Sequence, residues 1–259
     1  MGFLPPRRCA QGRRSEQEDD MTPSLEQWKV LPHGQLTEVD ENILTVTGDL
    51  QMPLAHIPRR MTVVRLADGR LVIFSAISLA EAQMRELEAY GRPSFLIVPN
   101  DHHRLDAKAW KERYPALQVV APEGARGKVQ AVVPVDTTNP RWDDPNVQFI
   151  AVPGTLERES ALLVQSRHGT TLVLNDVIGN MPDESGFGGW FLRKMGFAGD
   201  QPHIPGPVRL LMVDDKAALR RQLLQWADIE SLHCILVSHG LPIDERPQQT
   251  LRELASTLA

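Results

Sequence analysis

Short apolar runs and stretches of helical periodicity alternate along the chain, and Gly, Pro, Asn or Asp separates most of them. Runs rich in β-branched residues predict strands, and two pairs of such runs, each joined by a short polar turn, predict β-hairpins. Helical spacing that stops at Gly or Pro predicts helices between and after the hairpins. The expected strands are 41–48, 61–66, 71–74, 94–98, 117–121, 131–135, 147–152, 160–166, 170–174 and 234–237, and the expected helices are 79–90, 107–114, 215–226 and 247–258.

The order of these elements predicts two β-sheets packed face to face with helices outside, an αββα sandwich of the α/β (α+β) class. Residues 40–120 and 130–240 form two similar halves, each with a hairpin followed by strand–helix units. A chain of 259 residues can bury one large core. We therefore expect one domain at 21–259 behind a disordered tail at 1–20, with Met21 as an alternative start.

Residues 179–207 break this pattern, because they are rich in Gly, Pro and Phe and have no clean period. Residues 190–195 favour a short helix within this segment. A loop of this length inside a domain is usually functional or mobile. Two interpretations are open for the aromatic cluster Phe187–Phe191. It forms a lid over an active site, or it packs on the edge of the domain or on another subunit, and the contact with another subunit would make the protein a homo-oligomer.

Charge and composition narrow the class of protein. The net charge of -5 disfavours a general binder of nucleic acid or anionic membrane. No apolar run approaches the roughly 18 residues that cross a bilayer, and residues 1–20 lack the apolar segment of a secretory signal. Cys9 lies in the polar tail and Cys234 in an apolar strand, so we expect no disulfide and a cytoplasmic protein. The expected partner is a small-molecule substrate.

Polar clusters follow four of the apolar runs, at the places where the strands are expected to end. They are Asn100-Asp101-His102-His103, Pro153-Gly154-Thr155, Asn175-Asp176 and Ser238-His239-Gly240. Active sites of layered α/β proteins form where strand ends converge and loops carry the side chains. Imidazole and carboxylate groups are the ligands of a catalytic zinc, which needs about three of them and one open position.

In this order the clusters resemble the metallo-β-lactamase-like hydrolase superfamily. Its pattern is Thr-His-x-His-x-Asp-His after a strand, then Pro-Gly-His, an Asp at the end of a hairpin strand, and a late Gly-His-Gly. The resemblance covers roughly residues 40–245 and is closest to a divergent branch in which Asn and a His pair replace the first motif. It implies a four-layer αββα sandwich with the site at one edge. It also implies that Asp176 is the bridging carboxylate of the family and His239 its last His.

Two registers of the first motif are open. In one register, Asn100 and His102 take the His-x-His places, and Arg104 falls where the family has a metal-binding Asp. In the other register, Asp101 and His103 take those places, because alternate residues of an extended segment point the same way.

We prefer the second register, because it puts no cation beside the metal and places Asp106 on the final His position. The expected metal ligands are then His103, Asp176 and His239, holding one ion of zinc, iron or manganese, and we expect no organic cofactor. Asp101 and Asp106 are predicted to act as general base or extra ligand; their alternative role is to favour the first turn of the helix at 107–114. Beside the ligands we expect His102, Asn100 and Thr155, the last of which replaces the His after Pro-Gly.

The sequence leaves two main functions open. One is a hydrolase in which a metal-bound hydroxide attacks an ester, thioester, lactone or phosphoester. The other is a non-catalytic scaffold of the same fold, used to bind a ligand or a protein, since several ligands of the family are replaced. We favour the hydrolase, because ligand-capable residues persist in distant segments. A third interpretation is a structural subunit that docks a partner through residues 179–207.

Overall fold

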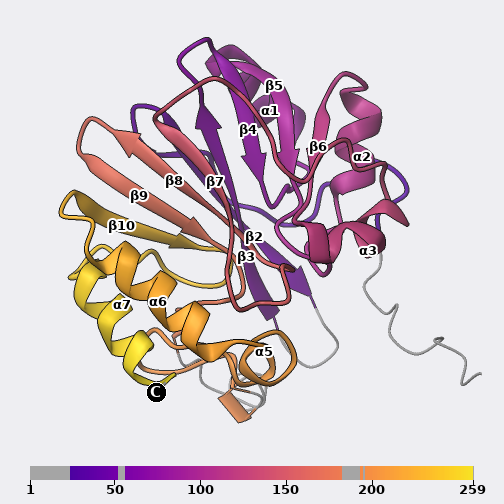
Figure 1. The fold of residues 1–259 in the computed structure, drawn as a ribbon. Helices are drawn as coiled ribbons and strands as arrows, with labels where there is room; N and C mark the ends of the chain where they lie inside the picture. The colour runs from indigo at the N-terminus through magenta and orange to yellow at the C-terminus, as the bar shows by residue number, and fades with distance from the viewer. Residues whose placement is uncertain (1–23, 52–55, 183–192, 195, 259) are drawn as a thin grey trace, which may run out of the picture.

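The computed structural model describes residues 24–51, 56–182, 193–194 and 196–258 (Figure 1). In this part of the chain the strands are β1 (Thr37–Asp40), β2 (Ile43–Gln51), β3 (His56–Arg65), β4 (Arg70–Phe74), β5 (Arg92–Ile97), β6 (Gln118–Val120), β7 (Val147–Ala151), β8 (Ser160–Ser166), β9 (Gly169–Leu174) and β10 (Leu232–Val237). The helices are α1 (Glu81–Tyr90), α2 (Ala107–Arg113), the 3₁₀ turn η1 (Glu123–Ala125), α3 (Arg126–Gln130), α5 (Gly206–Leu211), α6 (Lys216–Ala227) and α7 (Pro247–Ser256). The expected tail at 1–20 and the aromatic cluster Phe187–Phe191 lie outside the described residues.

Within the described residues, six strands form the first sheet in the order β1-β2-β3-β4-β5-β6. The strands from β1 to β4 are antiparallel neighbours, and β4, β5 and β6 are parallel. The predicted hairpin of β3 and β4 turns at Asp68-Gly69, where Gly69 has a φ of 81° that glycine adopts without strain. The parallel strands β4 and β5 are connected through α1, and β5 and β6 through α2.

Four strands of the described chain form the second sheet in the order β10-β9-β8-β7. Strands β8 and β9 form the second predicted hairpin, and β10 joins the edge of β9 as a parallel neighbour. Because β9 and β10 run in the same direction, the loops that follow them leave the sheet at the same edge.

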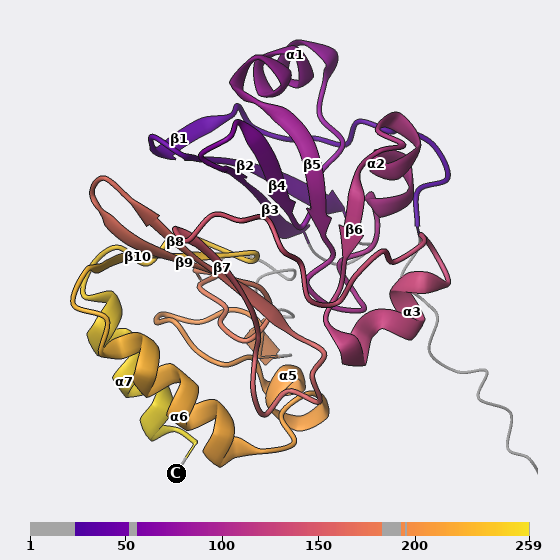
Figure 2. The ribbon, with the colours of Figure 1, turned by 45° about the horizontal axis from the view of Figure 1, so that its top comes forward.

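The two sheets pack face to face between two layers of helices (Figure 2). The core between the sheets includes Phe74, Phe95, Trp142, Leu162 and Leu236. Helices α1 and α2 cover the outer face of the first sheet, and α6 and α7 cover that of the second. The four-layer sandwich expected from the sequence is therefore confirmed.

The structure corrects the prediction in one segment and adds to it in others. The strand expected at 131–135 is wrong: this segment continues from α3 as a turn, in which the N–H groups of Val132 and Val133 both bond to the carbonyl of Val129. Pro134 also lacks the N–H that a strand ladder needs. Strand β1, η1 and α3 are too short to give a periodic signal.

Cys234 is a buried free thiol, as the sequence led us to expect, while Cys9 lies outside the described residues. Of the helices that the structure describes, none is both long and apolar enough to cross a membrane.

Candidate metal centre

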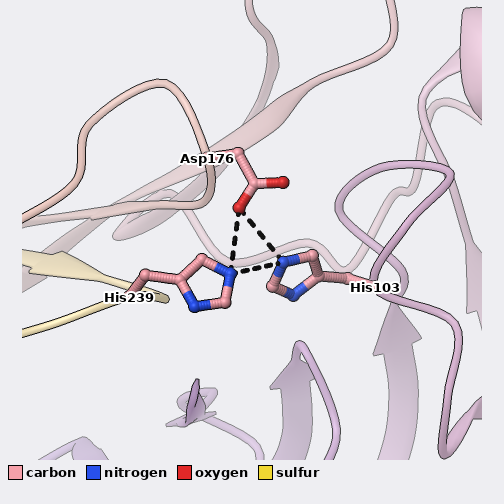
Figure 3. A group of neighbouring side chains, drawn as sticks. All are labelled: His103, Asp176 and His239. Atoms are coloured by element: carbon pink, nitrogen blue, oxygen red, sulfur yellow. Dashed lines mark hydrogen bonds and ion pairs between the residues drawn. The ribbon is translucent and has the colours of Figure 1, made fainter. Parts of the chain in front are cut away.

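Three ligand-capable side chains converge from three loops at one edge of the sandwich (Figure 3). His103 follows β5 of the first sheet, whereas Asp176 follows β9 and His239 follows β10 of the second sheet. The Nε2 atoms of the two imidazoles lie 3.1 Å apart. Asp176 Oδ1 lies 3.1 Å from His103 Nε2 and 3.2 Å from His239 Nε2.

Both imidazoles are oriented by a hydrogen bond at the nitrogen that points away from this group. His239 Nδ1 donates to the carbonyl of Pro58 at 2.7 Å, because a carbonyl can only accept. The Nε2 atom of a neutral His239 therefore carries a lone pair. His103 Nδ1 lies 2.8 Å from the hydroxyl of Ser75, which can accept its proton. Such a partner on the far nitrogen is the usual companion of a metal-binding histidine.

Asn100 fixes the orientation of the carboxylate. Its Nδ2 donates to Asp176 Oδ2 at 2.6 Å and to Glu159 Oε1 at 2.5 Å. Its Oδ1 accepts the N–H groups of His102 at 2.8 Å and His103 at 3.0 Å, which turns the chain sharply at 100–103. Asn100 thus directs the other oxygen of Asp176, Oδ1, towards the imidazoles.

Burial and mutual interactions shift the pKa values of the three converging side chains and of Glu159 in opposite directions. Burial lowers the pKa of His103. Burial alone would also lower the pKa of His239, but its hydrogen bond and charge interaction with Asp176 raise it. Burial would raise the pKa of Asp176, yet the two histidines hold it well below its usual range. Burial and the charge of Asp176 raise the pKa of Glu159 well above the usual value, so the neutral form of Glu159 is favoured.

Arg60 and Gly240 hold the loop that carries His239. The buried guanidinium of Arg60 donates to the carbonyls of Val237 at 3.2 Å and Gly240 at 2.9 Å, on either side of the loop. Gly240 has a φ of 112°, and a Cβ at this position would lie 2.0 Å from the carbonyl oxygen of Asn180. Only glycine permits this close approach of the two backbones.

The donor set fits a divalent ion. Two imidazoles and one carboxylate are a ligand set found at catalytic zinc sites. Ligand atoms about 2.0–2.1 Å from a tetrahedral ion lie about 3.3 Å from one another. The measured separations of 3.1–3.2 Å are close to this value. A lone pair on His239 and a carboxylate oxygen facing one another also require a proton or a cation between them. The side chains of His103, Asp176 and His239 are 10%, 15% and 24% exposed, so the group is open to solvent on one side.

Asp106, predicted as a catalytic residue, lies in a buried ion pair instead. Its Oδ2 is 2.5 Å from Arg59 Nη1, and its Oδ1 accepts the N–H of Ser78 at 2.9 Å. Both oxygens are therefore occupied, one by a side chain of β3 and the other by the backbone of the loop that follows β4.

Asp101 also has partners other than the converging group. Its Oδ2 bonds to Arg158 and lies 3.3 Å from Lys128 Nζ, and its Oδ1 lies 3.1 Å from His102 Nδ1. Burial alone would raise the pKa of Asp101, but His102 and Arg158 hold it well below its usual range. The expectation that Asp101 and His103 point the same way is wrong, because this segment turns rather than extends.

Thr155 and three residues outside the predicted set complete the surroundings. The buried hydroxyl of Thr155 donates to the carbonyl of Val152 at 2.7 Å and stabilises a turn. These three residues are Ser75, Pro58 and Glu159, and two of them, Ser75 and Pro58, were not predicted from the sequence. Ser75 is a single polar residue after β4, with a φ of 57° that is uncommon outside glycine. Pro58 contributes a backbone carbonyl, for which the sequence holds no signal.

Comparisons with known proteins identify the fold. No family model matches the chain, and no curated protein matches it. The solved structures that match include the DIM-1 metallo-β-lactamase exposed to ceftazidime, with 13% identity and a TM-score of 0.60, covering 89% of this chain and 100% of that one. They also include the FIM-1 metallo-β-lactamase from Pseudomonas aeruginosa in a mono-zinc form, with 12% identity and a TM-score of 0.58, covering 88% and 97%. A metallo-β-lactamase from Hirschia baltica matches with 11% identity and a TM-score of 0.57, covering 86% and 98%. The chain therefore has the metallo-β-lactamase fold, as its motifs indicated.

Proposed function

We propose that this protein of metallo-β-lactamase fold is a metal-dependent hydrolase with one ion, held by His103, Asp176 and His239. The observation that carries the proposal is the convergence of three ligand atoms within 3.2 Å of one another from three separate loops. Each of these side chains is oriented by a further hydrogen bond. When bound, the ion supplies Lewis acidity, which polarises a substrate oxygen and lowers the pKa of water towards neutrality.

The protein supplies binding and orientation around this centre. The carbonyl of Pro58 keeps the Nδ1 proton on His239, and the hydroxyl of Ser75 can accept that of His103, so that both Nε2 lone pairs can face the centre. Asn100 holds Asp176 with Oδ1 inward, and Glu159 anchors the amide of Asn100. We assign Asp101 and Asp106 to structural ion pairs and not to the proton transfer predicted from the sequence.

The same contacts favour one ion over two. Bridging of two ions through both oxygens of Asp176 would compete with the hydrogen bond that Asn100 donates to Oδ2. The ligand positions that a second ion would use in the related pattern hold Asp101, which pairs with cations, and Thr155, whose hydroxyl bonds to a carbonyl. A single ion accords with the fold neighbour that is described in a mono-zinc form.

The proposed substrates are an ester, thioester, lactone or phosphoester. All four contain an electrophilic carbon or phosphorus with an oxygen that a bound cation polarises. The fold alone does not choose among them, because one scaffold of this kind supports many chemistries.

Elemental analysis by plasma mass spectrometry tests the proposal on protein purified without chelator or histidine tag. We expect a ratio of zinc, iron or manganese to protein near one, which His239→Ala and Asp176→Asn abolish. His56→Ala is the matched control, because His56 is exposed and bonds only to Asp49 among the described residues. The metal-loaded protein should then hydrolyse a chromogenic substrate of one of the four classes, and the His239→Ala variant should not.

The second candidate is a binding module without catalysis. The observation that favours it is the replacement of two ligand positions by an ion pair and a threonine turn. A metal ratio near zero in the wild type, unchanged after incubation with zinc, iron or manganese, would select this candidate and contradict the hydrolase.

A further inference from the structure

Two cations converge on one oxygen of a buried carboxylate beside the candidate metal centre. Arg158 Nη2 bonds to Asp101 Oδ2, and Lys128 Nζ lies 3.3 Å from the same oxygen. His102 Nδ1 lies 3.1 Å from the other oxygen of this carboxylate, Oδ1. We call Asp101, His102, Lys128 and Arg158 the Asp101 cluster. None of these four side chains takes part in the proposed metal binding.

Short covalent links place the Asp101 cluster next to the centre. Asp101 and His102 lie between Asn100 and His103 in the chain, and Arg158 directly precedes Glu159. The residues that flank the cluster, Asn100 and Glu159, are hydrogen-bonded to each other.

A buried arginine positions the lysine of the cluster. Arg104, which is 3% exposed, donates from Nη1 to the carbonyl of Lys128 at 2.8 Å. This bond ties the end of α3 to the loop that carries His103.

The Asp101 cluster carries more positive charge than its carboxylate can balance. Without counting His102, one aspartate faces one arginine and one lysine, which leaves a net charge of +1. Asp101 is 1% exposed, whereas the side chains of Lys128, Arg158 and His102 are 49%, 21% and 53% exposed. The negative charge is thus buried, and the donors reach solvent. In the part of the chain that the structure describes, Asp101 is the acidic partner of both cations.

The unused donors suit an anion with several oxygens. A guanidinium offers five N–H donors and an ammonium three, and one carboxylate oxygen accepts only a small part of them. A carboxylate or phosphate can bond to both groups at once, and hydrogen bonds of this kind are stronger than those between neutral groups.

We propose that Lys128 and Arg158 form an anion-binding subsite, which receives a carboxylate or phosphate group of the substrate next to the metal centre. That this anion belongs to a substrate rests on the proposed hydrolase function, whereas anion binding at Lys128 and Arg158 does not. The substrate is then an anionic ester, thioester, lactone or phosphoester. Its charged group lies on the Lys128 side of the centre, and the scissile bond lies at His103, Asp176 and His239.

Calorimetric titration with inorganic phosphate, and separately with acetate, tests the subsite at low ionic strength. The full-length His239→Ala variant is used beside the wild type, because a bound metal can itself take an anion. We expect binding to both proteins. Lys128→Gln, introduced into each, should weaken it about 10-fold, since one charge-assisted bond is lost. This variant leaves Arg158 on Asp101, so the buried carboxylate stays paired.

Lys216→Gln is the matched control, because Lys216 is exposed at the start of α6 and does not belong to the Asp101 cluster, and we expect it to leave the affinity unchanged. Added salt should also weaken binding through screening. Equal affinities of the wild type and Lys128→Gln would overturn the proposal, as would loss of phosphate binding in His239→Ala. The metal ratio of each wild-type sample is measured in parallel, so that a failed subsite is distinguished from a failed metal centre. Preference for phosphate or for acetate identifies the anionic group.

Discussion

Replacement of Asp106 by alanine tests whether this residue stabilises the fold or serves the chemistry of the centre. Its side chain is fully buried, and its carboxylate lies 2.5 Å from Arg59 Nη1, whose side chain is 10% exposed. It also accepts the backbone N–H of Ser78 at 2.9 Å. The substitution leaves a guanidinium with little access to water and without its anion.

The expected cost follows from these contacts. Removal of one partner of a buried ion pair typically destabilises a protein by about 3–5 kcal/mol, because the remaining charge has lost both water and its partner. A natural domain has only about 5–15 kcal/mol of stability in total. We therefore expect Asp106→Ala to lose about 3–5 kcal/mol in its free energy of unfolding.

Urea denaturation followed by circular dichroism measures this loss. Asp228→Ala is the matched control: it also removes the aspartate of an ion pair with an arginine, here Arg252 at 3.1 Å, but both side chains of that pair are more than half exposed. That variant should change stability by only a few tenths of a kcal/mol. The folded fraction of Asp106→Ala should keep its metal ratio. A loss of stability below about 1 kcal/mol, or a loss of metal without a loss of stability, would refute the structural role of Asp106.

Three further predictions concern the loop of His239 and the far end of the sandwich. Gly240→Ala should lower the free energy of unfolding by more than about 1 kcal/mol and release the metal, because a Cβ at this position has no room. Gly127→Ala is the control and should not destabilise the protein, because a Cβ there meets no atom within 4 Å. Urea denaturation and metal content are measured on both variants. Arg60→Lys should weaken metal binding about 10-fold in a competition titration with a chelating dye, since a lysine cannot bond to both sides of the loop. Burial would raise the pKa of Asp40, but hydrogen bonds with Glu41 and His168 lower it, so the stabilising effect of Asp40 is present at neutral pH and is lost below about pH 4. Asp40→Asn should then be less stable than the wild type by about 1.5–3 kcal/mol at pH 7, and an equal difference at pH 3 would contradict this.

The sequence predicted those elements that neighbouring residues along the chain specify. Alternation and an Asp-Gly turn located the hairpin of β3 and β4, and the placement of polar residues after apolar runs located His103, Asp176 and His239. A strand fixes the direction of its side chains, so the ends of strands can be inferred from the pattern.

Contacts that depend on distant segments could not be inferred in this way. The pairing of Arg59 with Asp106 joins residues 47 positions apart, and the direction of Asp101 depends on a turn made by Asn100. Both aspartates are ordinary ligand candidates until the position of the cations is known. Every residue has a backbone carbonyl, so no sequence pattern distinguishes the carbonyl of Pro58 from the others.

The three side chains of the centre come from both sheets, and this determines when the centre can form during folding. His103 belongs to the first sheet, which is complete at β6, and Asp176 and His239 belong to the second, whose last strand is β10. The group can form only after both sheets have folded and docked, so an ion held by it is a cross-link between the two halves of the sandwich. A ligand that binds the folded chain alone adds about 4 kcal/mol to stability at a thousandfold excess over its Kd. Occupancy of the centre would then report that assembly of the sandwich is complete.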